Sequence, residues 1–288
     1  MNKNDKIEIL YEDDNLMIIY KPSGLLSVPY SGNRSHTAQE VIENMMRKNG
    51  SYNSKHRPLP VHRLDRDTSG VMMFALNEST QQKIMDSWHQ MVTERLYIAV
   101  AENPKNPHKY LPKTGLIDEP LAYNAYNIAF VPEKDDSKNN FKTVPARTEY
   151  RTIVRGKTHT LFELSLDTGK KNQIRAHLAS KDYPLAGDTN YRAATNPFGR
   201  LCLHARTLEF VHPFTNKKMK FEIPEPKEWQ EFVEKSTSAA FEQKSRGNVK
   251  SGEPHKKKEH AQSVEGTRKL RRKELAHMNF IEQGKKRR

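Results

Sequence analysis

The sequence predicts an α+β protein, built on a mixed, mainly antiparallel sheet with flanking helices and loops. Short segments of alternating or continuous apolar residues recur along the first 235 positions and indicate strands. A few segments between them carry apolar residues at helical spacing instead. The chain shows no regular strand–helix alternation and no repeat of fixed period, which argues against a parallel α/β sheet or a solenoid.

The N-terminal stretch IEILYEDDNLMIIYKPSGLL predicts a strand, an acidic turn and a second strand that ends at Pro22 and Gly24. Thr37, followed three residues later by Glu40, resembles a capping box. Apolar residues then repeat at helical spacing until Gly50, so we expect a helix between Thr37 and Gly50.

The remaining helices, strands and loops of residues 1–235 are predicted from the same kinds of pattern. Ser79 is expected to cap a second helix, and residues 103–145, rich in Pro and Asn, are expected to form loops. The other expected elements are strands at 94–102, 146–155, 158–167, 208–212 and 218–223, a turn entering a short helix at 168–182, and a helix around Trp229.

The end of the chain is strongly basic. Residues 244–288 hold 15 Lys/Arg and 5 Asp/Glu, so +10 of the net charge of +14 lies there. Together with the composition shift near Lys235, this predicts a folded domain at 1–235 and a basic low-complexity extension at 236–288, disordered or partly helical. Such an extension adds affinity for phosphates without choosing a site, although a solubilising segment with no partner fits its composition equally well.

Several classes of protein are disfavoured. The absence of a long apolar run and of a signal peptide predicts a cytoplasmic protein with no membrane span. The single Cys202 excludes internal disulfides and a cysteine-based zinc cluster. No P-loop, GxGxxG or HExxH motif occurs, and the histidines lack metal-ligand spacing. We therefore expect no metal and no cofactor. The sequence is silent on oligomeric state, so a monomer is the default expectation.

The stretch VHRLDRDTSGVMMFALN, residues 61–77, places charge directly before an apolar strand. If its first residues are extended, Arg63 and Asp65 point the same way. Residues 71–76 are apolar on both faces, as in a central strand. A carboxylate beside such a strand needs hydrogen bonds or an opposite charge. Taken alone, an ion pair within the turn, for example with Arg66, is the simpler interpretation.

Two more side chains stand out. At 100° per residue, Arg175 in QIRAHLA falls inside the apolar arc that includes Ile174 and Leu178, so a carboxylate partner is expected. A catalytic pair and a purely structural buried pair fit that arc equally well. In ERLYIAV, Tyr97 shares a strand face with Arg95, where its ring could stack on a nucleobase, although a core position is more common.

Five stretches together resemble one family. They are ILYEDDNLMIIYKPSGLLSVP, HRLDRDTSGV, ERLYIAV, LDTGKKNQIRAHLASKDYPLAGDTNY and LCLHARTLEFVHP. In content and order they resemble the RluA-type RNA pseudouridine synthases, over about residues 9–224, and HRLDxxTSG is the most specific of them. The resemblance implies the pseudouridine synthase fold, with residues 1–235 as a stand-alone catalytic domain that lacks an N-terminal S4 domain. The basic extension is expected to substitute for that domain in binding RNA.

The resemblance also implies an activity, the isomerisation of particular uridines in structured RNA to pseudouridine without a cofactor. It assigns catalysis to Asp65, with Arg175 as its ion-pair partner and Tyr97 against the base. We expect ribosomal RNA rather than transfer RNA as the substrate. The residues expected to contact RNA are Arg63, which would hold the flipped nucleotide, and His62, Thr68, Lys170, Lys171 and Gln173.

Two departures from the family pattern affect the RNA contacts. The third motif commonly reads Gly-Arg-x-His-Gln, whereas here it is GKKNQ, residues 169–173, and Arg95 stands where Lys is usual. Arg and Lys are not equivalent at a bidentate phosphate contact. Together with the basic extension, the altered third motif suggests an alternative function, that of a non-catalytic RNA-binding or ribosome-assembly factor that retains the fold.

Overall fold

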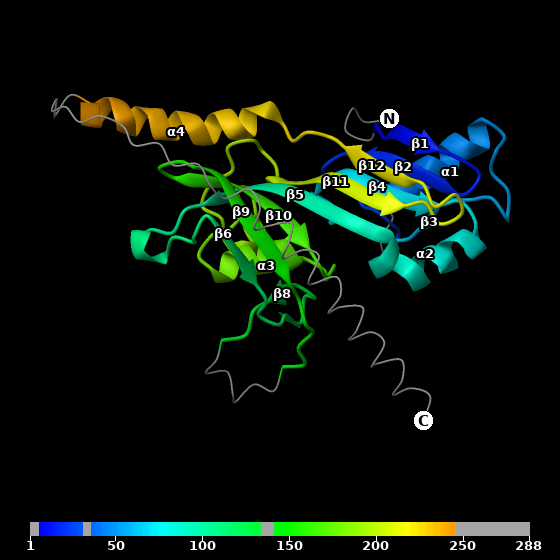
Figure 1. Cartoon of the computed structure of the whole chain (residues 1–288), viewed down its shortest axis with the longest axis horizontal. Helices are drawn as coiled ribbons and strands as arrows, with labels where there is room; N and C mark the ends of the chain where they lie inside the picture. The colour runs from blue at the N-terminus through cyan, green and yellow to red at the C-terminus, as the bar shows by residue number, and fades with distance from the viewer. Residues whose placement is uncertain (1–5, 31–35, 134–140, 246–288) are drawn as a thin grey trace. The chain divides into compact units, whose positions relative to one another are not determined.

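The computed structural model describes residues 6–30, 36–133 and 141–245. Within them one ten-stranded sheet has the order β1-β2-β4-β11-β5-β10-β9-β6, with β3 beside β4 and β12 beside β11 (Figure 1). Among the described strand pairs, only β4 and β11 are parallel, so the predicted mixed, mainly antiparallel sheet is confirmed. The strands of this sheet are β1 (Glu8–Glu12), β2 (Leu16–Lys21), β3 (Leu59–Pro60), β4 (Ser69–Ala75), β5 (Val92–Glu102), β6 (Thr114–Ile117), β9 (Thr148–Arg155), β10 (His159–Leu166), β11 (Leu203–Val211) and β12 (Lys218–Glu222).

Helices flank the sheet, as expected. They are α1 (Ala38–Lys48), α2 (Glu78–Met91), α3 (Gln173–Ser180) and α4 (Lys227–Ser245), with 3₁₀ turns η2 (Pro107–Lys109) and η4 (Thr189–Tyr191). The predicted capping box of α1 is present, because Thr37 and Glu40 each bind the other's backbone N–H. The predicted cap of α2 was wrong: Asn77 accepts from the Thr80 N–H at 2.8 Å, and Ser79 donates its hydroxyl to Asn77. Helix α2 therefore begins one residue before Ser79.

Residues 103–145 were expected to be loops, and that was only partly right. Strand β6 pairs with β9 and closes one edge of the sheet, while β7 (Ala122–Tyr123) and β8 (Ala129–Phe130) form a separate hairpin. These strands are two to four residues long. They are therefore too short to show the alternation that marks a strand in a sequence.

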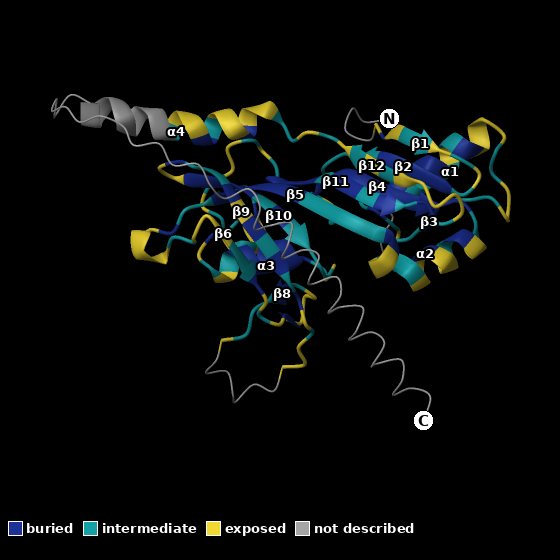
Figure 2. Ribbon diagram, in the orientation of Figure 1, coloured by how far each residue is buried: buried dark blue, intermediate teal, exposed yellow. Residues whose placement is uncertain are grey.

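The core lies on both faces of the sheet. Every residue of β4 is buried, which confirms the prediction of a central strand, and Figure 2 shows exposed residues on the outward sides of α2 and of the first turns of α4. Helix α1 adds Ile42 and Met46 to the largest apolar cluster, and α4 adds Trp229 and Val233 to another, beside β5 and β10.

Gly70 explains how β4 lies so close to β11. Its φ is +129°, and a Cβ at this position would lie 2.1 Å from the carbonyl oxygen of Ala205 on β11. Any larger residue would push the two strands apart. The glycine of the TSG motif thus fixes the start of β4, and with it the turn that carries Asp65.

Helix α4 continues past Lys235, and residues 1–244 form one compact unit. The division into a catalytic domain at 1–235 and a basic extension at 236–288 stays a prediction. The expected disorder or partial helix of that extension lies mostly outside the described residues. In the part of the chain that the structure describes, no helix is long and apolar enough to cross a membrane.

Candidate active site

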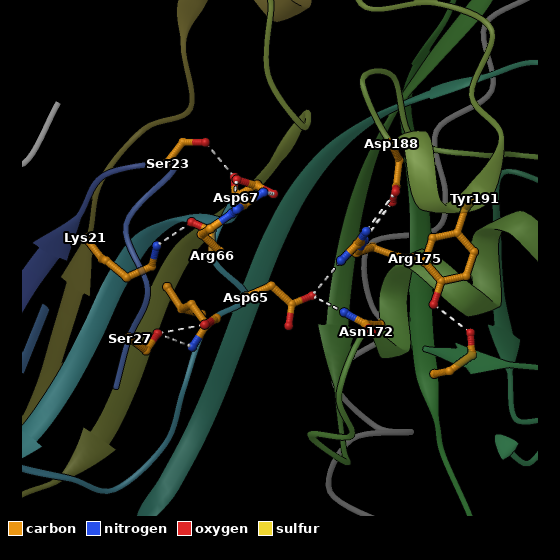
Figure 3. Close-up of polar contacts among 12 residues, drawn as sticks. Lys21, Ser23, Ser27, Asp65, Arg66, Asp67, Asn172, Arg175, Asp188 and Tyr191 are labelled. Atoms are coloured by element: carbon orange, nitrogen blue, oxygen red, sulfur yellow. Dashed lines mark hydrogen bonds and ion pairs between the residues drawn. The ribbon is translucent and has the colours of Figure 1, made fainter. Parts of the chain in front are cut away.

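Asp65 lies in the turn between β3 and β4, and residues 21–27 hold the chain on both sides of it. The Ser27 hydroxyl donates to the Leu64 carbonyl at 2.6 Å and accepts from the Leu64 N–H at 3.1 Å. The Ser23 hydroxyl donates to the Asp67 carbonyl at 2.7 Å. These contacts fix the backbone on either side of the carboxylate (Figure 3).

Lys21 makes the strongest of these anchors. Its ammonium is fully buried and donates to three carbonyl oxygens, those of Pro22 (2.9 Å), Leu25 (2.6 Å) and Arg66 (3.0 Å). Burial lowers the pKa of Lys21 to about 7, and nearby carboxylates oppose that shift. The side chain thus ties the end of β2 to the residue after Asp65. In the sequence, KPSG indicated only the end of a strand.

Arg175 has two carboxylate partners and is almost completely buried. Its Nε and Nη2 donate to Asp188 at 2.6 and 2.8 Å, and its Nη1 donates to Oδ2 of Asp65 at 3.1 Å. Burial opposes the charge on Arg175, but hydrogen bonds to Asp188 and the charges of both carboxylates raise its pKa. The prediction that Arg175 has a carboxylate partner is confirmed.

Asp188 is the partner that the sequence did not reveal. It is 2% exposed and holds the Nε–Nη2 edge of the guanidinium, while Nη1 contacts Asp65. Asp188 follows Leu185, Ala186 and Gly187, and no regular spacing in the sequence relates it to helix α3. The ring of Tyr191 lies 5.2 Å from the Arg175 guanidinium, so the guanidinium is confined on that side too.

Asn172 gives Asp65 a second donor. Its Nδ2 lies 2.7 Å from Oδ2 of Asp65, the same oxygen that Arg175 contacts. Its backbone has φ +57° and ψ 17°, the left-handed conformation, directly before α3. Asn adopts this conformation more readily than most residues.

A cleft of about 460 Å³ opens beside these groups. Its walls come from the Asp65 turn, α2, β5, the turn before α3 and β11, so residues far apart in the sequence meet there. The lining residues are Val61, His62, Arg63, Leu64, Asp65, Thr68, Met85, Trp88, His89, Arg95, Tyr97, Leu166, Thr168, Gly169, Lys170, Asn172, Gln173, Ile174, Arg175 and Leu203. Of the predicted site residues, Lys171 is not in this lining.

Tyr97 and Arg95 share one wall of the cleft, as their alternation on the strand predicted. Tyr97 is 9% exposed, and burial raises its pKa, so its phenol stays neutral. Arg95 donates to the Leu166 carbonyl at 2.9 Å, and its guanidinium lies 5.8 Å from the ring of Trp88. The wall therefore combines flat aromatic surface with positive charge.

Two predicted RNA-contacting residues, Gln173 and His62, make hydrogen bonds within the protein. Gln173 uses its carbonyl oxygen for Thr168 and the Lys170 N–H, and its amide N–H groups for Arg147 and Thr148. It therefore shapes the turn before α3.

His62 accepts the Met73 N–H on Nε2 at 2.9 Å, and its ring lies 5.2 Å from that of Trp88. Burial lowers the pKa of His62 to about 3, so the ring is neutral. For His62 and Gln173, direct contact with RNA stays a prediction.

Metal ligands are not grouped in this region. Among the described residues, no three His, Cys, Asp or Glu side chains lie close enough to hold a metal ion. The cleft instead brings together one carboxylate, two donors that share one of its oxygens, and a mixed aromatic and cationic wall. Such a site suits chemistry at a planar base attached to a phosphate backbone.

Comparison with known proteins agrees with this geometry. The family model for RNA pseudouridylate synthases matches residues 15–180. The chain belongs to this family. Among pseudouridine synthases, it is 31% identical over 241 residues to ribosomal large subunit pseudouridine synthase D of Xanthomonas campestris, covering 79% of this chain and 68% of that protein. An uncharacterised RNA pseudouridine synthase of Bacillus subtilis is 31% identical over 229 residues, covering 79% and 72%.

The fold agrees with a solved member of the family as well. Human RNA pseudouridylate synthase domain containing 4 superposes with a TM-score of 0.57 at 22% identity, covering 77% of this chain and 90% of that one. The predicted pseudouridine synthase fold and RluA-type family are therefore confirmed, and the protein is an isomerase that acts on RNA.

Proposed function

We propose that this chain isomerises uridine in ribosomal RNA, with the Asp65 carboxylate as the reacting group. The observation that carries this proposal is the position of Asp65 in the cleft wall. Its side chain is 19% exposed and pairs with the buried Arg175 at 3.1 Å. Ribosomal RNA is supported by the relatives named ribosomal large subunit pseudouridine synthase D.

The reaction can follow two routes from the same carboxylate. As a nucleophile, Asp65 bonds to C1′ while the N1–C1′ electron pair leaves with uracil, and C5 of the turned base later displaces the carboxylate. As a base, Asp65 takes the ribose C2′ proton, so that C1′=C2′ forms as uracil leaves, and it returns this proton to C2′ when C5 bonds to C1′. In both routes C5 finally bonds to C1′ and loses its proton, and N1 gains one. Pseudouridine has the same composition and the same number of electrons as uridine, because the proton lost from C5 is matched by the one gained at N1, so the proposal includes no cofactor.

The target uridine must leave its stack to reach this group. Extrusion costs a few kcal/mol, which favours uridines in loops. We assign Tyr97 to the face of the base, because it is buried in the cleft wall beside Asp65. Arg63 is exposed at the same cleft and fits the predicted role of holding the flipped nucleotide.

Contacts to the RNA backbone are assigned to the turn before α3. Lys170 is exposed and lines the cleft, while Lys171 lies next to it outside the lining. Thr68 lines the cleft but is buried, so a contact from it would reach only the inserted nucleotide. We further propose that the protein works as a monomer, in the cytoplasm and without a metal ion.

Mapping pseudouridine in ribosomal and transfer RNA, with and without the gene, tests the proposal. We expect one or a few ribosomal positions to lose the modification on deletion and to regain it with the wild-type gene. A map unchanged by deletion would favour the alternative, an RNA-binding assembly factor. Loss confined to transfer RNA would keep the chemistry and reject the ribosomal substrate.

A further inference from the structure

The two donors to Asp65 both reach the same oxygen. Asn172 donates to Oδ2 at 2.7 Å, and Nη1 of Arg175 donates to Oδ2 at 3.1 Å. Oδ1 accepts no hydrogen bond from any described residue, and Figure 3 draws it with no partner. In the part of the chain that the structure describes, the contacts of the carboxylate are therefore asymmetric, with both donors on Oδ2 and none on Oδ1.

We infer that Asn172 is a positioning residue, which holds Oδ2 together with Arg175 and so directs Oδ1 at the ribose. This inference deepens the proposed function and rests on the role of Asp65 in it. A hydrogen bond to a charged oxygen is worth roughly twice a neutral one, so two such bonds hold Oδ2 in place, whereas no described residue donates to Oδ1. Held at one oxygen only, the carboxylate keeps its free oxygen available to react.

Arg175 could not define this orientation alone. Asp188 takes one N–H each of Nε and Nη2, and Arg175 makes a single contact with Asp65, from Nη1; one contact allows the carboxylate to rotate about its Cβ–Cγ bond. A second donor from another direction removes that freedom. Asn172 supplies it from the turn before α3, whereas Arg175 lies inside the helix.

The identity of residue 172 suits this role. Both Asp65 oxygens are acceptors, so the Asn172 atom at 2.7 Å is its amide N–H. The amide does not titrate between pH 5 and 9, so the contact persists over that range. The left-handed backbone of Asn172 admits Asn, Asp, His and Gly, which provides a set of substitutions that keep the turn.

Asn172→Asp has nearly the same shape but places a second carboxylate against Oδ2. Two carboxylates at this distance cannot both be ionised at low cost, so the variant needs a proton on the pair to keep the contact. Relative to wild type, its kcat should therefore fall by about tenfold or more as pH rises from 6 to 9. The titratable groups that also act on Asp65, common to both proteins, are Lys21, Tyr97, Tyr123, Arg175 and Tyr191.

Asn172→Gly keeps the left-handed backbone and removes the donor. Its kcat should fall by about 10- to 100-fold, as expected for a hydrogen bond to a charged group, with KM nearly unchanged. Asn172→His restores a donor in a residue that tolerates this backbone, and should recover most of the lost rate. A purely structural role would lower stability in all three variants and would not create the pH dependence.

The assay measures tritium release from ribosomal RNA that is labelled with [5-³H]uridine and isolated from a strain lacking the gene. The variants are tested as full-length proteins, and only where their thermal unfolding matches that of the wild type. Wild-type rate and pH profile in both Asn172→Gly and Asn172→Asp would overturn this inference while leaving the proposed function standing. A wild-type protein that releases no tritium would overturn both.

Discussion

Replacing Asp188 with Asn should destabilise the protein severely, because it leaves the Arg175 guanidinium without its main partner. Asp188 is 2% and Arg175 8% exposed, so water cannot replace the lost charge. Two contacts, at 2.6 and 2.8 Å, are affected, since an Asn side chain can accept only on its carbonyl oxygen and its N–H groups would face a cation. Breaking a buried ion pair from one side costs about 3–5 kcal/mol.

That free energy converts to a loss in Tm of about 6–20 °C for a domain of this size. The measurement is denaturant unfolding, with thermal melting as a second probe. Asp182→Asn is a matched control, because Asp182 pairs with Lys109 at 2.6 Å but both side chains are more than half exposed. The control should lose less than about 1 kcal/mol. If Asp188→Asn and Asp182→Asn lower the free energy of unfolding equally, burial is not the reason that the Arg175–Asp188 pair stabilises the protein.

The same substitution should also lower kcat. With Asp188 neutral, the Arg175 guanidinium is free to turn toward Asp65 and contact both of its oxygens. The reacting oxygen would then be occupied. Tritium release at a temperature well below the new Tm separates this effect from unfolding.

The sequence was most informative where a residue's role depends on its near neighbours. The capping box of α1, the buried strand β4 and the position of Arg175 in an apolar arc each depend on spacings of a few residues, and all three were predicted correctly. The start of α2 was missed by a small margin, because Asn77 and Ser79 are both good N-caps and only the backbone decides between them.

Partners brought together by the fold could not be read from the sequence. Asp188 and Asn172 meet Arg175 and Asp65 only because a turn and a loop converge beside α3, and no spacing encodes that approach. Lys21 is a similar case, since its three carbonyl acceptors come from two segments that are distant in the chain. Hydrogen bonds to backbone carbonyls leave no residue-type signature at the accepting position.

Three further predictions concern the frame of the site and the basic extension. Burial lowers the pKa of Lys21 from 10.5 in the unfolded chain to about 7, so between these pH values the unfolded state binds more protons than the folded state. The unfolding free energy of the wild type should therefore rise by about 2 kcal/mol relative to that of Lys21→Met between pH 7 and pH 9. No such rise would contradict the prediction. Gly70→Ala should lower the free energy of unfolding by about 3 kcal/mol or more, because the new Cβ would clash with a carbonyl of β11. Gly24→Ala, whose Cβ would have nothing within 4 Å, should lower it by less in the same assay. Deleting residues 244–288 should weaken RNA binding and flatten its salt dependence in filter-binding titrations without changing the modified uridine, and modification of a different position would contradict this.

The most direct test of the central claim compares Asp65→Asn with Asp67→Asn in the full-length protein. Asp67 lies in the same turn, but its carboxylate pairs with Arg66 at the surface, so it controls for the change of charge and of the turn. Tritium release under single-turnover conditions should be abolished in Asp65→Asn and kept within a few-fold of wild type in Asp67→Asn, with RNA binding retained in both. Tritium release by Asp65→Asn at the wild-type rate would contradict the assignment of Asp65 as the reacting group.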